Sequence, residues 1–346
     1  MYIARSVHPL PGEAERKERL LSLVDGFASR RVLVVGDLIA DEFIYGQIAR
    51  VSREAPVLIL NYDSTEIVPG GAGNAASNVA ALGGDATTVG VVGRDESGRR
   101  LLATMKRRRI DVRRMVVPSG YRTPTKTRIL AGGIHSAKQQ VVRIDRAANG
   151  AADERTRALF EDRVLTAAAA ADALLVSDYG TALVTPALVA RARDRMRLPI
   201  VLVDSRYDLL RFTGMTACTP NESEVEQALG IRIGDNVRAL ERAGRAVLRR
   251  TRSRAVLVTR GSRGMALFRA GEKTIHIPIV GSDQIADVTG AGDTVIATMA
   301  LALAAGGTFE EAAQLANHAG GLVVMKRGTA TVTAAELRAS LTQRAE

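Results

Sequence analysis

The sequence predicts an α/β fold with a doubly wound, mainly parallel central sheet. Short apolar runs bounded by Gly, Pro or Asp alternate with segments of helical period, and this alternation is typical of parallel sheets covered by helices. Several of the runs are continuously apolar, as expected of strands buried on both faces. The expected strands are residues 31–36, 57–61, 87–92, 173–177, 200–204 and 255–259, and the expected helices are 73–82, 98–109, 153–171, 185–196, 221–229, 236–251 and 290–305.

Two segments interrupt the alternation. Residues 38–62 and 122–146 are rich in β-branched residues and have no helical period. We expect them to form a small accessory β-structure, a lid inserted in the first half of the chain. Residues 1–30 are interpreted as an N-terminal extension with one polar helix over 13–23, and residues 333–344 as a terminal helix.

The composition excludes several classes of protein. Lys and Arg total 48 against 37 Asp and Glu, so the formal net charge is +11, and 46% of the 346 residues are hydrophobic. These proportions are typical of a folded globular protein. The longest nearly apolar stretch, residues 294–305, is shorter than the ~18–20 residues of a membrane span, and residues 1–17 lack a signal-peptide core. We therefore expect no membrane partner and a cytoplasmic location.

The basic charge does not by itself indicate a nucleic-acid partner. The densest basic runs, 106–109 and 249–254, end helical patterns, where cations favour the helix C-terminus. Aromatic residues make up 3% of the chain and Trp is absent, so few side chains can stack on bases. We expect a solvated basic surface that attracts small anions and no nucleic-acid binding. The single cysteine, Cys218, excludes an intrachain disulfide, and the four histidines lack zinc-ligand spacing.

The most informative motif is the run DVTGAGDT over residues 287–294, which leads directly into an apolar helix. Backbone N–H groups of Gly290, Ala291 and Gly292 at the positive end of that helix would form an anion site. Asp293 would repel a merely bound anion, but it suits a base that accepts a proton from a hydroxyl attacking phosphorus, as in a kinase. The alternative is that Asp293 only favours the helix start and the glycines only form a tight turn.

A second glycine cluster covers residues 69–78. Its Gly71-x-Gly73-x-x-Ala76 spacing formally satisfies a dinucleotide fingerprint, so an NAD(P)-dependent oxidoreductase is an alternative. That fingerprint should close the first strand, whereas this cluster lies well downstream of residues 31–36. We expect Gly70 and Gly71 to allow close approach of a sugar, with the Asn74 amide bonding its hydroxyls. A helix-packing turn is the plainer alternative.

Three further groups of residues lie where ligands of open α/β sheets collect. Asp37 and Asp41 follow the first strand and suit sugar hydroxyls, or else serve as turn and cap residues. Asn221 and Glu224 share one helix face and suit Mg²⁺ held through water near phosphates, although a capping-box pair has the same spacing. Thr259, Arg260, Gly261 and Gly264 follow a buried strand, where they contact a nucleotide or form a plain turn.

The order of these motifs resembles the ribokinase-like (PfkB) carbohydrate kinases over about residues 31–340. Thr298 departs from the family pattern, which usually has Ala or Gly there. The resemblance implies a three-layer α/β sandwich with a mainly parallel central sheet and a small β-lid, formed by residues 31–346. It also implies ATP and Mg²⁺ as cofactors, a sugar or sugar phosphate as the small-molecule partner, and a homodimer paired through the lid.

Within the family the chain is most similar to the heptose 7-phosphate kinases of lipopolysaccharide-core precursor synthesis. Two matching segments are the most specific, RVSREAPV over 50–57 and GTATV over 328–332. Thr181 departs from this pattern, since a Lys commonly follows SDYG, and Asp204-Ser205-Arg206-Tyr207 replaces Asp-Pro-Lys-Gly. Arg206 keeps a cation at the second place, whereas the Lys replaced by Thr181 is lost, and such cations suit anionic ligands.

The resemblance implies a role for each motif. Asp293 would be the base, and Gly290, Ala291 and Gly292 the anion hole. The acceptor would contact Asp37, Asp41, Gly70, Gly71 and Asn74, with Lys126, Arg128 and Arg143 meeting its phosphate. Asn221 and Glu224 would organise Mg²⁺, and Thr259, Arg260, Gly261 and Gly264 would line the ATP site. The expected reaction converts heptose 7-phosphate into heptose 1,7-bisphosphate at the anomeric hydroxyl. A kinase of fructose, ribose or a sugar acid, and a non-catalytic sugar or nucleotide sensor, remain alternatives.

Overall fold

An eight-stranded sheet forms the centre of the computed structural model, which describes residues 11–132, 138–149, 152–197, 199–280, 287–326 and 328–342. The strand order is β12-β11-β10-β9-β8-β7-β1-β4, and all pairings are parallel except those of β11 with β10 and β12. The strands are β1 (Arg31–Gly36), β4 (Asp85–Val89), β7 (Ala173–Asp178), β8 (Val201–Ser205), β9 (Ala217–Cys218), β10 (Ala255–Thr259), β11 (Met265–Arg269) and β12 (Ile275–Ile277). The predicted α/β class is confirmed.

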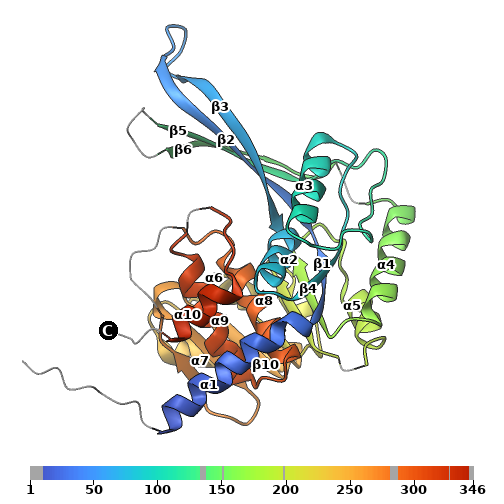
Figure 1. The fold of residues 1–346 in the computed structure, drawn as a ribbon, viewed down its shortest axis with the longest axis vertical. Helices are drawn as coiled ribbons and strands as arrows, with labels where there is room; N and C mark the ends of the chain where they lie inside the picture. Colours follow the sequence, from blue (N-terminus) through green and yellow to red (C-terminus); the bar gives the residue numbers. More distant parts are fainter. Residues whose placement is uncertain are drawn as a thin grey trace, which may run out of the picture.

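Helices cover both faces of this sheet, which gives the three predicted layers (Figure 1). The inner strand residues alternate between two hydrophobic clusters: Val32 and Val34 face one helical layer, and Leu33 and Val35 face the other. One layer contains α1 (Pro11–Asp25), α2 (Ala72–Ala81), α3 (Glu96–Arg107), α8 (Ala291–Ala304), α9 (Phe309–Val323) and α10 (Ala334–Thr342). The other contains α4 (Glu154–Ala168), α5 (Pro186–Arg193), α6 (Glu222–Leu229) and α7 (Val237–Thr251).

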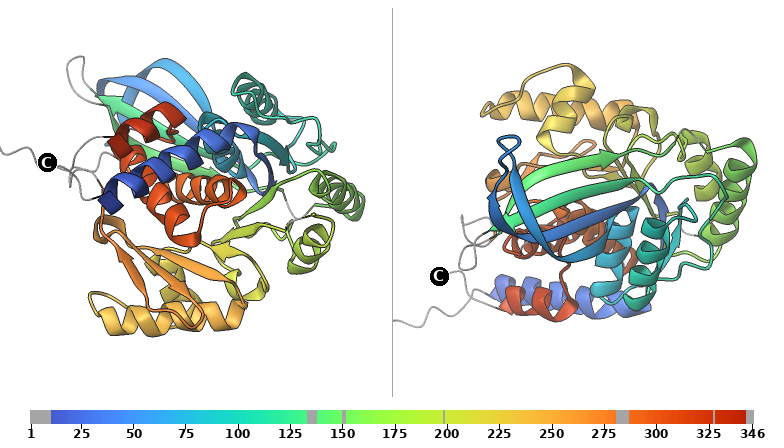
Figure 2. Two further views of the ribbon diagram at one scale, coloured as in Figure 1. Left: turned by 60° about the horizontal axis from the view of Figure 1, so that its bottom comes forward. Right: turned by 90° about the horizontal axis from the view of Figure 1, so that it is seen from above.

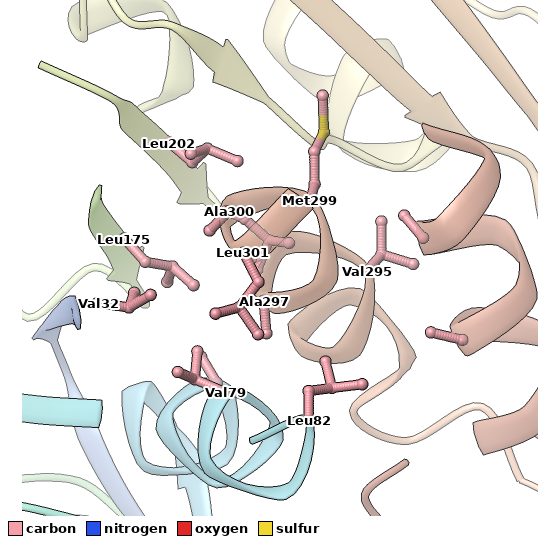
Figure 3. Close-up of a cluster of buried hydrophobic side chains, with 14 of the residues drawn as sticks. Val32, Val79, Leu82, Leu175, Leu202, Val295, Ala297, Met299, Ala300 and Leu301 are labelled. Atoms are coloured by element: carbon pink, nitrogen blue, oxygen red, sulfur yellow. The ribbon is translucent and has the colours of Figure 1, made fainter. Parts of the chain in front are cut away.

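The apolar helix α8 is the centre of the first layer. Figure 3 shows its Ala297 and Leu301 between Val79 of α2 and the sheet residues Val32 and Leu175. An apolar residue on every side of a helix indicates full burial, and α8 is buried from Asp293 to Leu303. This packing fixes the N-terminus of α8, and with it the GAGD turn, relative to α2 and the strand ends.

A second sheet of four strands forms the lid, in the order β3-β2-β5-β6. Its strands are β2 (Leu38–Val51), β3 (Leu58–Gly71), β5 (Thr125–Gly132) and β6 (Gln139–Arg146). Strands β2 and β5 pair in parallel, and each pairs with its other neighbour in antiparallel fashion. In β2 and β3 the ends nearest the central sheet are buried, whereas the far ends are exposed and extend beyond the body of the molecule (Figure 1). Strand β6 is exposed along its whole length.

The structure corrects several predicted boundaries. The first lid segment does not end at residue 62. The strand expected over 57–61 begins at Leu58 and belongs to β3, which continues to Gly71 and so joins the lid to the glycine cluster. The polar residues Ser64, Thr65 and Glu66 lie in the middle of β3, so no continuous apolar run marks the whole strand in the sequence. The strand expected over 87–92 lies at Asp85–Val89. Strand β11, the edge strand β12, the short strand β9 and helix α9 were not predicted.

The polar helix expected in the N-terminal extension is α1, which lies beside α10 (Figure 2). Its Leu20 and Leu23 are buried in the first cluster, and Lys17 Nζ donates to the Thr342 carbonyl at 3.1 Å. Arg338 of α10 forms an ion pair with Asp25. The predicted terminal helix corresponds to α10; residues 1–10 and 343–346 lie outside the described part of the chain. No helix in the described ranges is long and apolar enough to cross a membrane.

Candidate active site

The carboxyl ends of β1, β7 and β8 meet the N-termini of α2 and α8 at one edge of the central sheet, next to the buried end of the lid. Asp293 lies in the first turn of α8 and is only 4% exposed. Asn74 of α2 donates from Nδ2 to Asp293 Oδ2 at 2.8 Å. The other carboxylate oxygen, Oδ1, is buried and has no hydrogen-bond partner among the described residues. One oxygen is therefore fixed and the other is available to a ligand.

The environment of Asp293 raises its pKa to about 7. The largest cause is burial, which disfavours the charged form. The Asn74 hydrogen bond and the charge of Lys126 act in the opposite direction, whereas Asp41 and Glu224 raise the pKa further. A carboxylate that titrates near neutral pH is suited to accepting a proton during catalysis.

Gly290 sits at the point of closest packing between the GAGD turn and α2. Its φ of 80° lies in the left-handed region. A Cβ there would lie 2.5 Å from Asn74 Nδ2, so any side chain would displace the amide that holds Asp293. The N–H of Ala291 donates to the Val288 carbonyl at 3.2 Å and closes the turn. Within the described ranges, the N–H groups of Gly290 and Gly292 donate to no backbone carbonyl other than those of regular helix hydrogen bonds.

Lid residues cover the side of the site where the acceptor is expected. Arg128 of β5 donates to Asp41 Oδ1 of β2 at 2.7 Å, and both side chains are largely buried. A Cβ at Gly70 would lie 2.4 Å from Asp41 Oδ2, which explains the glycine next to this pair. Lys126 Nζ lies 5.5 Å from the centroid of the Tyr179 ring, and burial lowers its pKa.

Like Asn74, Asp41 and Arg128, the predicted acceptor contacts Asp37 and Arg143 also have protein partners. Asp37 is buried and accepts hydrogen bonds from the N–H of Tyr179 at 2.7 Å, the N–H of Thr181 at 3.3 Å and the Thr181 hydroxyl. Its carboxylate therefore fixes the loop after β7. Arg143 of β6 forms two 2.7 Å hydrogen bonds with Asp145 on the same strand. Gly71 caps the N-terminus of α2, and a Cβ there would approach the ring of Tyr179 to 3.5 Å.

On the opposite side of the site, Asn221 and Glu224 form a capping box at the start of α6. The Asn221 N–H donates to Glu224 Oε2 and the Glu224 N–H donates to Asn221 Oδ1, each at 2.9 Å. Burial raises the pKa of Glu224. Asn221 and Glu224 thus form the capping box that the sequence offered as the alternative. Glu224 is nevertheless close enough to the site for its charge to raise the pKa of Asp293.

Asp204, at the end of β8, was not predicted as a site residue. Burial raises its pKa well above the usual range, and the charges of Glu224 and Asp293 add to the effect. Asp204 Oδ2 would lie 4.0 Å from a Cβ built on Gly292, so this carboxylate borders the GAGD turn. The signal that could have identified it is its position, because Asp37 and Asp178 likewise close or follow the neighbouring strands β1 and β7.

The turn after β10 contains the remaining predicted residues. Arg260 donates from Nε to Glu222 Oε1 of α6 at 2.7 Å, so its charge is paired within the protein. The backbone of Thr259 forms an isolated parallel β-bridge with that of Asn221, which joins this turn to the capping box. Gly264 has φ 75°, and a Cβ there would lie 2.1 Å from the Ile277 carbonyl of β12. Gly261 lies in open space. The described residues contain no group of three or more potential metal-ligating side chains.

The layered fold, the lid and the buried acid at a helix N-terminus define a phosphotransferase that acts on an alcohol group. The family model for pfkB family carbohydrate kinases matches residues 29–336, and the chain belongs to this family. It is 41% identical over 327 residues to the bifunctional protein HldE of Caulobacter vibrioides. This match covers 93% of this chain and 65% of the relative. It is 37% identical to the bifunctional protein HldE of Trichlorobacter lovleyi, over 92% of this chain and 64% of the relative. The chain thus spans about two thirds of these relatives.

Solved structures share the fold at low sequence identity. Arabidopsis thaliana ribokinase, complexed with ribose and ATP, superposes with a TM-score of 0.68 at 19% identity, covering 91% of this chain and 99% of that chain. Escherichia coli phosphofructokinase-2, in complex with substrates and products, gives a TM-score of 0.70 at 19% identity, covering 90% and 98%. These likenesses confirm the predicted ribokinase-like architecture.

Proposed function

We propose that the protein is an ATP- and Mg²⁺-dependent kinase that phosphorylates heptose 7-phosphate at its anomeric hydroxyl to give heptose 1,7-bisphosphate in the cytoplasm. Membership of the carbohydrate kinase family supports the reaction class. Similarity to the proteins named HldE, together with the segments RVSREAPV and GTATV, supports a heptose phosphate as the acceptor.

The observation that carries the proposal is the state of Asp293. Its Oδ2 is held by Asn74, its Oδ1 lacks a partner among the described residues, and its pKa is about 7. In the proposed reaction Oδ1 accepts the proton of the anomeric hydroxyl as that oxygen bonds to the γ-phosphorus of ATP. The bond from this phosphorus to the bridging oxygen breaks, and ADP leaves with the electron pair. Of the three predicted anion-hole donors, the N–H groups of Gly290 and Gly292 would face the transferred group, whereas the Ala291 N–H is bonded to the Val288 carbonyl.

The acidic residues opposite Asp293 fit a divalent cation. Glu224 and Asp204 both have raised pKa values, caused first by burial and, for Asp204, by neighbouring carboxylates. A cation would offset that repulsion, and we propose that Glu224 and Asn221 hold Mg²⁺ through water, with Asp204 beside them. Bound Mg²⁺ neutralises phosphate charge during transfer. Thr259, Arg260, Gly261 and Gly264 would line the nucleotide side, with Arg260 kept in place by Glu222.

The lid would supply the charge that meets the phosphate of the acceptor. Lys126 and Arg128 are two residues apart on β5, so they share one face of the lid, and Arg143 pairs with Arg128 in the register of β5 and β6. Cations at this place would favour a phosphorylated sugar over a neutral one. We also propose that two copies pair through their lids, because apolar side chains such as Tyr62 and Val142 are exposed there.

A kinase of another sugar is the second candidate, and Thr181 is the observation that favours it. Its hydroxyl binds Asp37, at a position where related heptose kinases commonly have Lys. The test is ADP release with Mg²⁺-ATP and a panel of heptose 7-phosphate, sedoheptulose 7-phosphate, fructose, fructose 6-phosphate and ribose. Turnover on heptose 7-phosphate alone supports the first proposal, and turnover only on an unphosphorylated sugar supports the second.

A non-catalytic sensor would bind a ligand without turnover, and Asp293→Asn would leave that binding unchanged. If the folded protein with Mg²⁺-ATP transfers no phosphoryl group to any sugar of the panel, the kinase proposal fails.

A further inference from the structure

The segment GTATV, residues 328–332, lies against the turn that begins α8. Thr329 is 8% exposed, and its methyl carbon Cγ2 would lie 3.4 Å from a Cβ built on Gly290. The same Cβ would lie 2.5 Å from Asn74 Nδ2. Thr329 and Asn74, which are 255 residues apart in the chain, therefore border the same glycine from two sides. This contact was not predicted from the sequence.

The Thr329 hydroxyl is buried and lacks a hydrogen-bond partner among the described residues, as does Asp293 Oδ1. Burying a hydroxyl without a partner is unfavourable, because the group loses its hydrogen bonds to water. Valine has nearly the same shape and would avoid this cost. Both oxygen atoms belong to side chains at the GAGD turn, where Asp293 follows Gly290 and the Thr329 methyl group borders it. Two such atoms at one turn of the site point to a ligand that completes their hydrogen bonds.

The surroundings of Thr329 indicate which ligand. A Cβ at Gly328 would lie 4.0 Å from Cζ of Phe43, on lid strand β2. The ring of Phe43 lies 5.2 Å below the Arg128 guanidinium, which is paired with Asp41. Thr329 thus shares its side of the site with Asn74 and the lid. The capping box of α6 and the turn after β10 belong to the other side, where ATP is expected.

The backbone around Thr329 is held by three interactions. The Gly328 N–H donates to Asp287 Oδ2 at 3.0 Å. Lys326 Nζ donates to the Thr331 carbonyl at 2.7 Å and to Glu336 Oε1 of α10 at 2.6 Å. These contacts fix the segment immediately before and after Thr329. The hydroxyl is therefore preorganised at the turn, which reduces the entropy lost when a ligand binds.

We infer that the Thr329 hydroxyl binds a sugar hydroxyl of the acceptor next to the one that is phosphorylated, while Asp293 takes the proton of the reacting hydroxyl. This inference rests on the proposed kinase function and extends it, because it assigns a specificity-determining contact to the segment GTATV. Lys326 and Glu336 are positioning residues for that contact.

The test compares four variants with the wild type in ADP release at varied acceptor and varied ATP. Thr329→Val should lower kcat/KM for the acceptor about tenfold, with KM for ATP unchanged, and Thr329→Ser should recover it to within about twofold. Thr329→Ala reports the same loss if the valine variant does not fold. Thr88→Val is the matched control: Thr88 is fully buried in β4, its hydroxyl also lacks a partner within the described part of the chain, and it lies beside Val34 in the core.

Thr88→Val should leave kcat/KM for the acceptor unchanged. The inference is overturned if Thr329→Val and Thr329→Ala both behave like Thr88→Val while the wild type turns over. It is also overturned if Thr329→Val raises KM for ATP and leaves KM for the acceptor unchanged. A wild-type protein that phosphorylates no sugar would overturn the proposed function itself, so the two failures are distinguishable.

Discussion

At the scale of single residues, the reactivity expected of Asp293 results from burial more than from any one partner. A solvated carboxylate would be ionised far below neutral pH and would be a weak base. Burial in α8 and the nearby carboxylates raise its pKa to about 7, and the Asn74 amide limits that rise while it orients the group. The site thereby combines a base matched to neutral pH with a fixed direction for its free oxygen.

A pH dependence follows from this pKa. Asp293 must be ionised to accept a proton, so kcat/KM of the wild type should fall about tenfold per pH unit below about 7 and reach a plateau above it. Asp293→Asn should lower kcat by about 10³-fold and remove this dependence, with ATP affinity within about threefold of the wild type. The measurements are initial rates from pH 5.5 to 9 and ATP titration by calorimetry. A variant that keeps the same acidic limb would contradict the assignment.

Asp37 was predicted as a sugar contact, but in the structure its carboxylate binds the loop after β7. Its place after β1 suits a sugar contact, yet Thr181 and Tyr179 occupy its oxygen atoms with hydrogen bonds. Tyr179 lies under Lys126, so Asp37 fixes the loop that supports this cation. Thr181, which departs from the pattern of similar kinases, supplies the hydroxyl in that arrangement.

At the scale of elements, helix α8 offers an internal comparison between its two ends. Gly290 precedes the helix with φ 80°, and Gly306 follows it with φ 87°. Gly290→Ala should lower kcat/KM about 10²-fold, because a Cβ 2.5 Å from Asn74 Nδ2 would displace the amide that holds Asp293. Steady-state kinetics of the folded variant provides the measurement.

Gly306→Ala is the control for backbone strain alone. A Cβ at Gly306 meets no atom within 4 Å, so only the left-handed conformation is penalised. It should cost about 1 kcal/mol of stability and leave kcat/KM unchanged. Equal kinetic losses in the two variants would mean that the helix as a whole, rather than the contact with Asn74, controls the site.

At the scale of the whole molecule, the lid exposes apolar surface far from the central core. Tyr62 of β3 is 67% exposed and Val142 of β6 is 48% exposed, and every residue of β6 is solvent accessible. A sheet with exposed apolar residues and free strand edges favours pairing with another chain. This physical argument agrees with the proposed dimer.

Sedimentation should therefore give a mass of about twice 36.8 kDa for the wild type. Replacing both Val142 and Ile144 with Lys should shift the protein to monomer at micromolar concentration, because two buried cations per copy would oppose association. Val237→Lys is the control, since Val237 is also 48% exposed but lies on α7. A wild-type monomer, or dissociation by Val237→Lys to the same extent, would contradict pairing through the lid.

The α/β class, the mainly parallel sheet and the helix that carries Asp293 could be predicted from the sequence, because apolar period and glycine turns act over a few consecutive residues. A β-lid was also indicated, although the polar middle of β3 concealed how far that lid reaches.

The side chains that surround Asp293 could not be predicted from the sequence, because they come from distant segments of the chain. Asn74 bonds Asp293 across 219 residues, Thr181 bonds Asp37 across 144, and Thr329 borders Gly290 from a different segment. Such contacts depend on the packing of α2, α8 and the segment after α9, and no local pattern encodes it. Burial and partner atoms, which depend on that packing, determined the pKa of Asp293, the occupied oxygens of Asp37 and the lack of a partner for the Thr329 hydroxyl among the described residues.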